Sequence, residues 1–410
     1  MKKRAMACIL ALLMLLLQGI PALAEEGDAL EVWVRSTYYD IITEAAAVFT
    51  EKTGQPVKVT QAANMSDDLA LAISSGNTPD IVSIDCVLVP FYASIGAFKN
   101  VTAEVNALEY KDAFSDGALK LASYEGELYA VPLGPDVSVL IYNKELFAAN
   151  GLDPESPPAS WDELVKAAQA CTNDECYGYA YPGSSVGSMM FGFCPYIWSN
   201  GGEFTSEDGS ESLLNSPEAV AALQLYVDMI HQYGVTPKTI SSYTSTEVKD
   251  AFSAQKIAMT IQGTSFVRKV INGELDFDAG VALIPAADGE HFSSFLGGDD
   301  IAILNDTDKA DIAWQFVEYC LSEAVQVDLF STMGLMPARA DMFDHEVFQQ
   351  AEEWSVIRKA LEIGKAPYSL KYNELYTPFL DALQFAFNGE KTAQQAFDDA
   401  KAEIDAVLAE

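Results

Sequence analysis

The sequence has few positive charges, few histidines and, beyond its first residues, no long hydrophobic run. Only 24 lysines and arginines stand against 60 aspartates and glutamates, so the formal net charge is −36. An acidic surface of this kind repels nucleic acid and anionic lipid and keeps a protein soluble. We therefore expect no nucleic-acid partner, and anionic ligands are disfavoured.

The sequence also lacks the residue groups that usually hold a metal or a cofactor. Its three histidines, His231, His291 and His345, lie far apart, and no Cys-x-x-Cys pair accompanies them. No glycine-rich phosphate loop and no basic aromatic platform is present. We expect neither a metal site nor a cofactor, and no catalytic constellation stands out.

The first residues are typical of an export signal. Three positive charges, an apolar run over residues 9–17 and a small-x-small pattern ending at Ala24 follow one another. The run is shorter than the roughly 20 residues that span a membrane. We predict cleavage after Ala24, an uncleaved anchor being the alternative, and therefore an exported protein. Loss of three positive charges takes the net charge from −36 to −39.

Cleavage would leave an odd number of cysteines: Cys86, Cys171, Cys176, Cys194 and Cys320. At least one of them must then be a free thiol or pair with another chain. Cys171 and Cys176 flank a turn-rich stretch, which favours a local disulfide between them in an oxidising exterior.

The length and the periodicity predict two α/β lobes. A chain of this size exceeds what one hydrophobic core usually holds. Strand patterns over residues 30–34, 57–60 and 80–84 alternate with helix patterns, the first closed by Gly54 and the second running from Ser66 to Gly76. This alternation predicts a mainly parallel sheet covered by helices, with ligands beyond the carboxyl ends of its strands.

The rest of the chain continues the pattern without a low-complexity linker. We predict extended structure over residues 132–144 and strands over 177–181, 257–261 and 301–304. Helices are expected from the capping box at Ser160, from Ser216, over residues 312–321 and from the capping box at Thr392. Two lobes without a linker indicate that the chain crosses between them as strands.

One short motif suggests an enzyme. Residues 183–187 match the G-x-S-x-G turn that carries the nucleophile of serine hydrolases, with Ser185 as the nucleophile. Glycine and serine are common in turns, so a ligand-facing loop is the alternative interpretation. The many acidic residues single out no glycosidase pair.

An ordered series of landmarks resembles the extracellular solute-binding proteins, family 1, which serve importers of maltose and other sugars. The landmarks are residues 49–54, 75–81, 126–132, 141–147, 161–164, 258–263, 297–303, 313–316 and 334–339. The resemblance implies a type II periplasmic-binding-protein-like fold, with each lobe a mainly parallel sheet flanked by helices and a hinge of two or three crossing segments. We place the first lobe at residues 25–135 and 264–310, and the second lobe at residues 136–263 and 311–410.

The same resemblance implies a set of ligand-binding residues in the cleft between the lobes. These are Tyr38, Tyr39, Asp85, Asp136, Ser184, Ser185, Trp198, Gln262, Gly263, Gly298, Asp299 and Arg339. Phe266 stands near a position where the family often has a stacking tryptophan, which puts stacking there in doubt.

The function implied by the resemblance is capture of a small molecule that leaves chemically unchanged. We expect a monomer that binds a carbohydrate, such as an oligosaccharide, and delivers it to the membrane permease subunits of an ABC importer. A non-sugar ligand such as a polyamine in the same fold is the first alternative, and a secreted serine hydrolase is the second.

Overall fold

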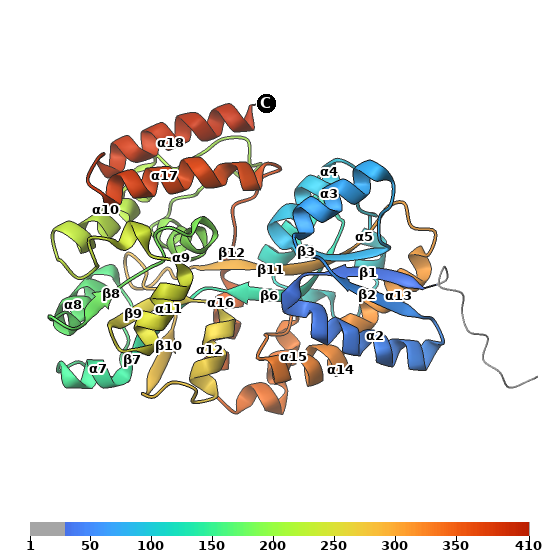
Figure 1. Ribbon diagram of the computed structural model, residues 1–410, viewed down its shortest axis with the longest axis horizontal. Coiled ribbons are helices and arrows are strands. Elements are labelled where there is room, and N and C mark those ends of the chain that lie inside the picture. Colours follow the sequence, from blue (N-terminus) through green and yellow to red (C-terminus); the bar gives the residue numbers. More distant parts are fainter. Residues whose placement is uncertain (1–28, 410) are drawn as a thin grey trace, which may run out of the picture.

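The computed structural model describes residues 29–409, which form two lobes between which the chain passes three times (Figure 1). The two-lobed α/β fold predicted from the sequence is confirmed, but the sheet of the second lobe is mainly antiparallel and not mainly parallel as predicted. The expected signal segment, residues 1–24, lies outside the described residues.

The first lobe is built on a sheet with the strand order β12-β11-β3-β1-β2, and β6 pairs with the other side of β11. Its strands are β1 (Leu30–Val34), β2 (Val57–Gln61), β3 (Ile81–Asp85), β6 (Val131–Val137), β11 (Ser294–Ile303) and β12 (Gly364–Lys365). β1 is parallel to β2 and β3, as predicted, whereas β11 runs antiparallel to both β3 and β6. Because β1 and β3 are parallel, their carboxyl ends meet at one edge of the sheet.

Helices cover both faces of this sheet. α2 (Tyr39–Thr53) ends at Gly54, whose φ of 78° is readily adopted only by glycine. α3 (Met65–Ser75) ends in the same way at Gly76, but it begins after Asn64 rather than at the predicted Ser66. One apolar cluster packs α2 against the sheet, and a second runs from the opposite face through the hinge into the second lobe.

The second lobe holds a four-stranded sheet with the order β10-β7-β9-β8. Its strands are β7 (Val139–Asn143), β8 (Tyr177–Tyr179), β9 (Ile257–Gln262) and β10 (Ala279–Ala282). The helices around it are α7 (Lys144–Ala149), α8 (Trp161–Cys171), α9 (Val186–Ser199), α10 (Pro217–His231), α11 (Ser245–Ser253) and α12 (Thr264–Ile271). The predicted capping box at Ser160 opens α8, and Ser216 caps α10.

The remaining elements are shorter or lie toward the carboxyl end of the chain. The helices are α4 (Val89–Ser94), α5 (Thr102–Asn106), α6 (Asp116–Leu121), α13 (Ala310–Cys320), α14 (Glu323–Gln326), α15 (Asp328–Met333), α16 (Glu353–Glu362), α17 (Tyr376–Phe387) and α18 (Ala393–Leu408). A hairpin joins β4 (Ser123–Tyr124) to β5 (Glu127–Leu128). Single 3-10 turns are η2 (Ser36–Tyr38), η3 (Cys86–Leu88), η4 (Lys111–Ala113), η5 (Ile240–Ser242), η6 (Ala340–Asp344), η7 (Glu346–Gln349) and η8 (Tyr372–Leu375).

The predicted lobe boundaries are wrong in two stretches. α12 and β10 belong to the second lobe, because β10 pairs with β7, although residues 264–310 were placed in the first lobe. α13 packs against α2 in the first lobe, with the rings of Phe49 and Phe316 5.2 Å apart, although residues 311–410 were placed in the second. The reason is that the chain crosses back inside the long strand β11, so no helix end or loop marks the passage in the sequence.

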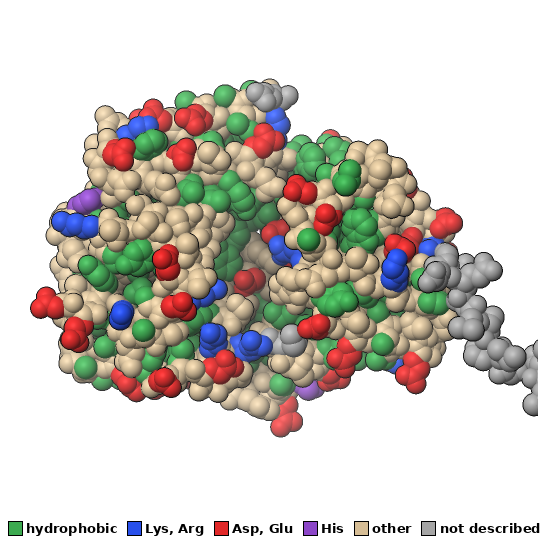
Figure 2. Space-filling model, viewed as in Figure 1, with side chains coloured by type: hydrophobic (Ala, Val, Ile, Leu, Met, Phe, Trp, Pro, Cys, Tyr) green, Lys and Arg blue, Asp and Glu red, His purple; other side chains and the backbone are tan. Residues whose placement is uncertain are grey.

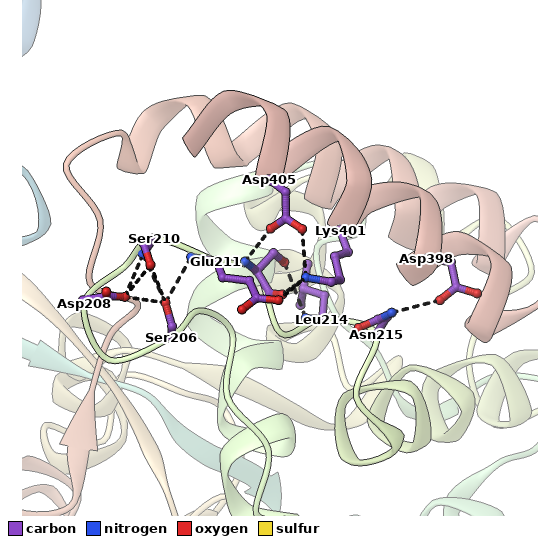
Figure 3. Close-up of polar contacts among 10 residues, drawn as sticks. Ser206, Asp208, Ser210, Glu211, Leu214, Asn215, Asp398, Lys401 and Asp405 are labelled. Atoms are coloured by element: carbon purple, nitrogen blue, oxygen red, sulfur yellow. Dashed lines mark hydrogen bonds and ion pairs between the residues drawn. The ribbon is translucent and has the colours of Figure 1, made fainter. Parts of the chain in front are cut away.

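A polar cluster fixes the last helix to a loop of the second lobe (Figure 3). Lys401 of α18 pairs with Glu211 and Asp405 at 2.8 Å each, and Asn215 donates a hydrogen bond to Asp398. Within the loop, hydrogen bonds from Ser206 and Ser210 lower the pKa of Asp208 to about 2. The predicted capping box at Thr392 opens α18, so this helix is anchored at its start and along its length.

The five cysteines of the described chain are buried free thiols. The predicted disulfide between Cys171 and Cys176 is therefore wrong. Cys171 ends α8 and its thiol lies 4.0 Å from the carbonyl of Leu146, whereas the thiol of Cys176 lies 3.4 Å from the carbonyl of Tyr177. Burial raises the pKa of Cys171 to about 12 and that of Cys176 to about 11, so both stay protonated and unreactive.

Candidate functional site

A cleft lies between the lobes at the carboxyl ends of β1 and β3. It consists of two adjoining hollows of about 340 and 270 Å³. The two hollows share Asp136, Gly187, Phe191 and Ser265, so they form one continuous space. Figure 2 shows the molecule hollowed between the lobes, with charged side chains of both signs near the opening. The position agrees with the expected site beyond the strand ends.

The first-lobe wall is organised around Arg35, the residue that follows β1. Its guanidinium donates to Asp85 at the end of β3 at 3.1 Å, and forms a short ion pair with Asp299 on β11. Ser83 donates a further hydrogen bond to Asp299 at 2.5 Å. Burial alone would lower the pKa of Arg35, but the charges of Asp299 and Asp85 outweigh burial and raise it. Arg35 is therefore a permanent cation locked between two carboxylates.

Asp136 stands where β6 leaves the first lobe. One of its oxygens accepts hydrogen bonds from the backbone N–H of Thr264, at 2.8 Å, and from the hydroxyl of the same residue. Asp136 therefore closes the amino-terminal end of α12. Burial raises the pKa of Asp136, although the two bonds from Thr264 oppose that shift. A Cβ atom at Gly263 would lie 2.6 Å from the other oxygen of Asp136, so only glycine fits there.

Aromatic rings form much of the remaining surface. Phe191 of α9 and Phe295 of β11 lie with their ring centres 5.5 Å apart, and both line the larger hollow. Tyr372 and Tyr376, in η8 and at the start of α17, pack edge to face at the same distance on another side of the hollow. The ring of Tyr38 also lines the larger hollow, and its hydroxyl donates to the carbonyl of Gly134 at 2.5 Å.

The second-lobe end of the cleft is polar. Ser188 and Ser245 share a hydrogen bond of 2.7 Å at the starts of α9 and α11. Gln262 at the end of β9 and Lys249 of α11 line the same hollow. No ion pair joins Lys249 to another described residue, but it shares the hollow with Asp136, and its charge opposes in part the rise that burial causes in the pKa of that carboxyl.

Half of the predicted site residues line this cleft. They are Tyr38, Asp85, Asp136, Gln262, Gly263 and Gly298. The sequence reasoning missed Arg35, Thr37, Gly187, Ser188, Phe191, Ser245, Lys249, Thr264, Ser265, Phe295, Leu335, Tyr372 and Tyr376. Arg35 and Thr37 could have been found, because they directly follow the first strand.

The other predicted residues do not line either hollow. Asp299 is fully buried behind Arg35. Tyr39 begins α2 and packs against the first-lobe core. Ser184 donates to the carbonyl of Tyr243, and Ser185 precedes α9. Their positions are explained by local packing.

Two predicted residues lie in other parts of the molecule. Trp198 ends α9 beside a separate hollow, with the amino group of Lys365 5.3 Å from its ring centre. Arg339 stacks on the ring of Tyr110 at 3.5 Å and pairs with Asp341, so it ties together the first lobe. Phe266 is buried against Phe252, in agreement with the doubt about stacking there.

The described residues bring no histidine to Ser185. His231 bonds the carbonyl of Phe387, His291 pairs with Asp288, and His345 lies 3.5 Å from Glu323. A serine hydrolase needs a base within hydrogen-bond reach of its nucleophile. The G-x-S-x-G match therefore marks a turn before α9. The described residues also hold no cluster of three metal-ligating side chains.

Comparison with known proteins identifies the family and the fold. Residues 44–355 match the family of bacterial extracellular solute-binding proteins. The chain belongs to this family. An arabinooligosaccharide-binding protein of Halalkalibacterium halodurans is 25% identical, over 86% of this chain and 81% of its own length. The maltodextrin-binding protein MdxE of Bacillus subtilis is 23% identical, over 93% and 90%.

Solved structures share the fold of this solute-binding protein. The sugar-binding protein MalE of Xanthomonas citri superposes with a TM-score of 0.84, at 18% identity, over 93% of this chain and 97% of its own. A solute-binding protein of Thermotoga lettingae, bound with α-D-tagatose, has a TM-score of 0.79 at 25% identity, over 93% and 100%. Among residues 29–409, no helix is both long and apolar enough to cross a membrane.

Proposed function

We propose that this solute-binding protein captures a neutral carbohydrate, such as an oligosaccharide, in the interlobe cleft and delivers it to the membrane subunits of an ABC importer. The single observation that carries the proposal is the lining of the cleft. Each of its two cations lies near a carboxylate, and the rest of its surface consists of aromatic rings, hydroxyls, the amide of Gln262 and aliphatic groups.

The placement of the charges favours an uncharged guest. Arg35 is paired with both Asp85 and Asp299, and Lys249 shares its hollow with Asp136. An anionic guest would find no cation without a nearby carboxylate. A cationic guest such as a polyamine would compete with Arg35 and Lys249 for the same carboxylates, so the cleft favours the carbohydrate over this alternative.

The aromatic and hydroxyl groups fit the two kinds of surface that a sugar ring presents. Phe191, Phe295 and Tyr376 offer flat apolar faces for sugar C–H groups. Ser188, Ser265 and Gln262 offer hydrogen-bond donors and acceptors for sugar hydroxyls. The two hollows of the cleft together enclose about 600 Å³, which lies within the roughly 300–1,000 Å³ of small-molecule sites.

The relatives support the same ligand class and the same partner. Their names record binding of arabinooligosaccharides and maltodextrins, and the matched structures include ABC-transporter proteins bound with sugars. We infer that this chain works as a monomer, binds without covalent chemistry and closes its lobes over the sugar. The described cleft holds no assembled nucleophile and base, which agrees with a binding role.

A thermal-shift screen tests the proposal. The protein is melted with neutral mono- and oligosaccharides, including arabino-, galacto- and maltooligosaccharides, and with spermidine as the cationic competitor. A ligand at 100 times its dissociation constant should stabilise the protein by about 2.7 kcal/mol. Stabilisation by spermidine alone, or by no sugar of the panel, would contradict the proposal.

A further inference from the structure

A second surface groove lies on the first lobe, outside the cleft. It is lined by residues of α3 and of the end of β2, the outer strand of the first-lobe sheet, and it encloses about 330 Å³. Figure 1 labels both elements. Trp33, Ala62, Leu71 and Ala72 supply its apolar surface, and no residue of it lines the cleft. The groove is therefore a separate space.

The side-chain direction of Trp33 explains how the groove arises. Leu30, Val32 and Val34 of β1 are fully buried on one face of the sheet, so Trp33 points to the opposite face. There it stands beside Thr60 of β2, its partner in the strand register. α3 covers this face only in part, because Leu69 and Ala72 are buried while Leu71 is 69% exposed. The indole of Trp33 thus stays half-buried at the base of an open groove.

Ser75 and Asp68 of the groove are hydrogen-bonded within the chain, but its other polar side chains have no partner among the described residues. The side-chain amides of Gln61 and Asn77 and the hydroxyl of Thr60 make no hydrogen bond there, and neither does the indole N–H of Trp33. The indole N–H of Trp33 is not fully buried, so solvent reaches it. In the cleft, by contrast, Asp136, Ser188 and Arg35 are bonded to other protein groups. The groove therefore offers free donors and acceptors around an aromatic ring.

The groove is nearly uncharged in a very acidic protein. Asp68 is the single charged residue in its lining, and this carboxylate accepts a hydrogen bond from the backbone N–H of Asn64. An anionic guest would find no cation in this lining, and a cationic guest would find a single carboxylate that already accepts a hydrogen bond. An aromatic ring, an aliphatic side chain and free amides match the C–H faces and hydroxyls of a neutral sugar.

We propose that the groove lined by Trp33, Thr60, Gln61, Leu71 and Asn77 is a second carbohydrate-binding site, which holds one or two sugar units of a neutral saccharide on the protein surface. The choice of ligand class rests on the proposed function, but the site is physically independent of the cleft. It lies beside the carboxyl end of β2, next to the strand whose end leads to Arg35, so saccharide held there stays near the cleft. Surface capture of this kind raises the local concentration of sugar at the cleft.

Affinity electrophoresis in native gels tests the second site. The probes are soluble starch, arabinan and galactan, cast separately into the gel, and retarded migration reports binding. Wild-type protein should be retarded by at least one of the three polysaccharides. Trp33→Ala should raise the dissociation constant for that polysaccharide about tenfold, because the stacking face is lost. Gln61→Ala and Asn77→Ala should each have a smaller effect in the same direction.

Matched variants separate this site from the cleft and from general damage. Leu71→Asn changes an exposed side chain, so it should have little effect on folding. It should weaken retardation, and it therefore tests the groove even if Trp33→Ala does not fold. Tyr177→Ala removes another exposed aromatic residue, on the second lobe, and should leave retardation unchanged. Tyr376→Ala, in the cleft, should weaken binding of short oligosaccharides but leave retardation by the polysaccharide intact.

Three results would overturn the second site. The first is unretarded migration of wild-type protein in all three gels, and the second is equal retardation of Trp33→Ala, Leu71→Asn and wild type. The third is a change in oligomeric state as the only effect of these variants, because that result would assign the groove to a contact between proteins. With any of these three results, equal thermal stabilisation of wild type and Trp33→Ala by short oligosaccharides would still support the proposed function of the cleft. Absence of any thermal shift, with retardation present, would contradict the function of the cleft and not the groove.

Discussion

The two walls of the cleft are built in different ways. The first-lobe wall depends on ion pairs, in which Arg35 joins the ends of two parallel strands to the returning strand β11. The second-lobe wall presents Ser188 and Phe191 from the first two turns of α9, and Ser265 from the first turn of α12. The first wall therefore fixes the geometry of the hinge, whereas the second wall presents an aromatic ring and hydroxyls to a ligand. Changes in the first wall should therefore affect folding, and changes in the second should affect binding.

The largest effect is expected from Arg35→Met. The substitution leaves Asp299 and Asp85 close together without their cation, and an uncompensated buried charge costs about 3 kcal/mol of unfolding free energy. Urea denaturation followed by circular dichroism measures this loss. Arg339→Met is the control, because its partner Asp341 is exposed and can be solvated. An equal loss of unfolding free energy in both variants would show that the ion pairs of Arg35 stabilise the protein no more than the partly exposed pair of Arg339 does.

Asp136→Ala should affect both folding stability and ligand binding, because Asp136 belongs to both walls. Loss of the cap on α12 should lower the unfolding free energy by about 1 kcal/mol. We also expect about tenfold weaker ligand binding by calorimetry, since a buried polar contact is lost.

Thr392→Ala is the matched control for Asp136→Ala. Thr392 caps α18, far from the cleft, so its loss should cost similar stability and leave the ligand affinity unchanged. Unchanged affinity in Asp136→Ala would exclude Asp136 from ligand contact.

Tyr376→Ala should change binding more than folding. Tyr376 is only half-buried, and its ring faces the larger hollow beside Tyr372. Loss of one aromatic face should weaken sugar binding by about 0.5–1.5 kcal/mol, or up to about tenfold. Titration calorimetry with the sugar found in the thermal-shift screen measures the change. Tyr376→Phe keeps the face and should bind nearly as wild type does; a large loss in that variant would assign the effect to the hydroxyl.

Asp300→Asn is expected to have the smallest effect on the free energy of unfolding at mildly acidic pH. Asp300 lies on β11 inside the first lobe, and burial together with the charges of Asp299 and Asp85 raises its pKa well above the usual value. The folded protein therefore keeps a proton that the unfolded chain releases above about pH 4. Stability contributed by this group is present below the unfolded pKa and falls as the pH rises toward the folded pKa.

Denaturation of wild type and Asp300→Asn at pH 5 and pH 8 tests this sign. The variant should gain stability relative to wild type as the pH rises, while ligand affinity at pH 5 stays the same. A difference in stability that is constant with pH would show that Asp300 does not titrate in this range.

The elements of the fold could be predicted wherever local periodicity and capping decide them. The strand over 30–34, the glycine ends of α2 and α3 and the capping boxes at Ser160 and Thr392 involve only residues near in sequence. The lobe boundaries could not be predicted in this way, because β11 continues through the hinge without any local signal.

The candidate site shows the same division. Asp85 could be predicted because it follows a strand recognised in the sequence, whereas Asp136 was nominated only through the family resemblance. Tyr372 and Tyr376 could not, because they reach the cleft from the carboxyl-terminal part of the chain, after the third passage between lobes. Arg339 was misplaced because its partner Tyr110 is remote in sequence and no local pattern joins them.

The sequence by itself determined the α/β alternation, the acidic surface and the family landmarks, since apolar spacing and charge act within a few residues or over the whole surface. Only the tertiary structure decided which polar groups are engaged and which are free. Arg35 meets Asp299 across 264 positions, and this contact depends on how two strands align in a packed sheet. The same packing leaves Trp33 uncovered, because α3 shields only part of the sheet face on which Trp33 stands.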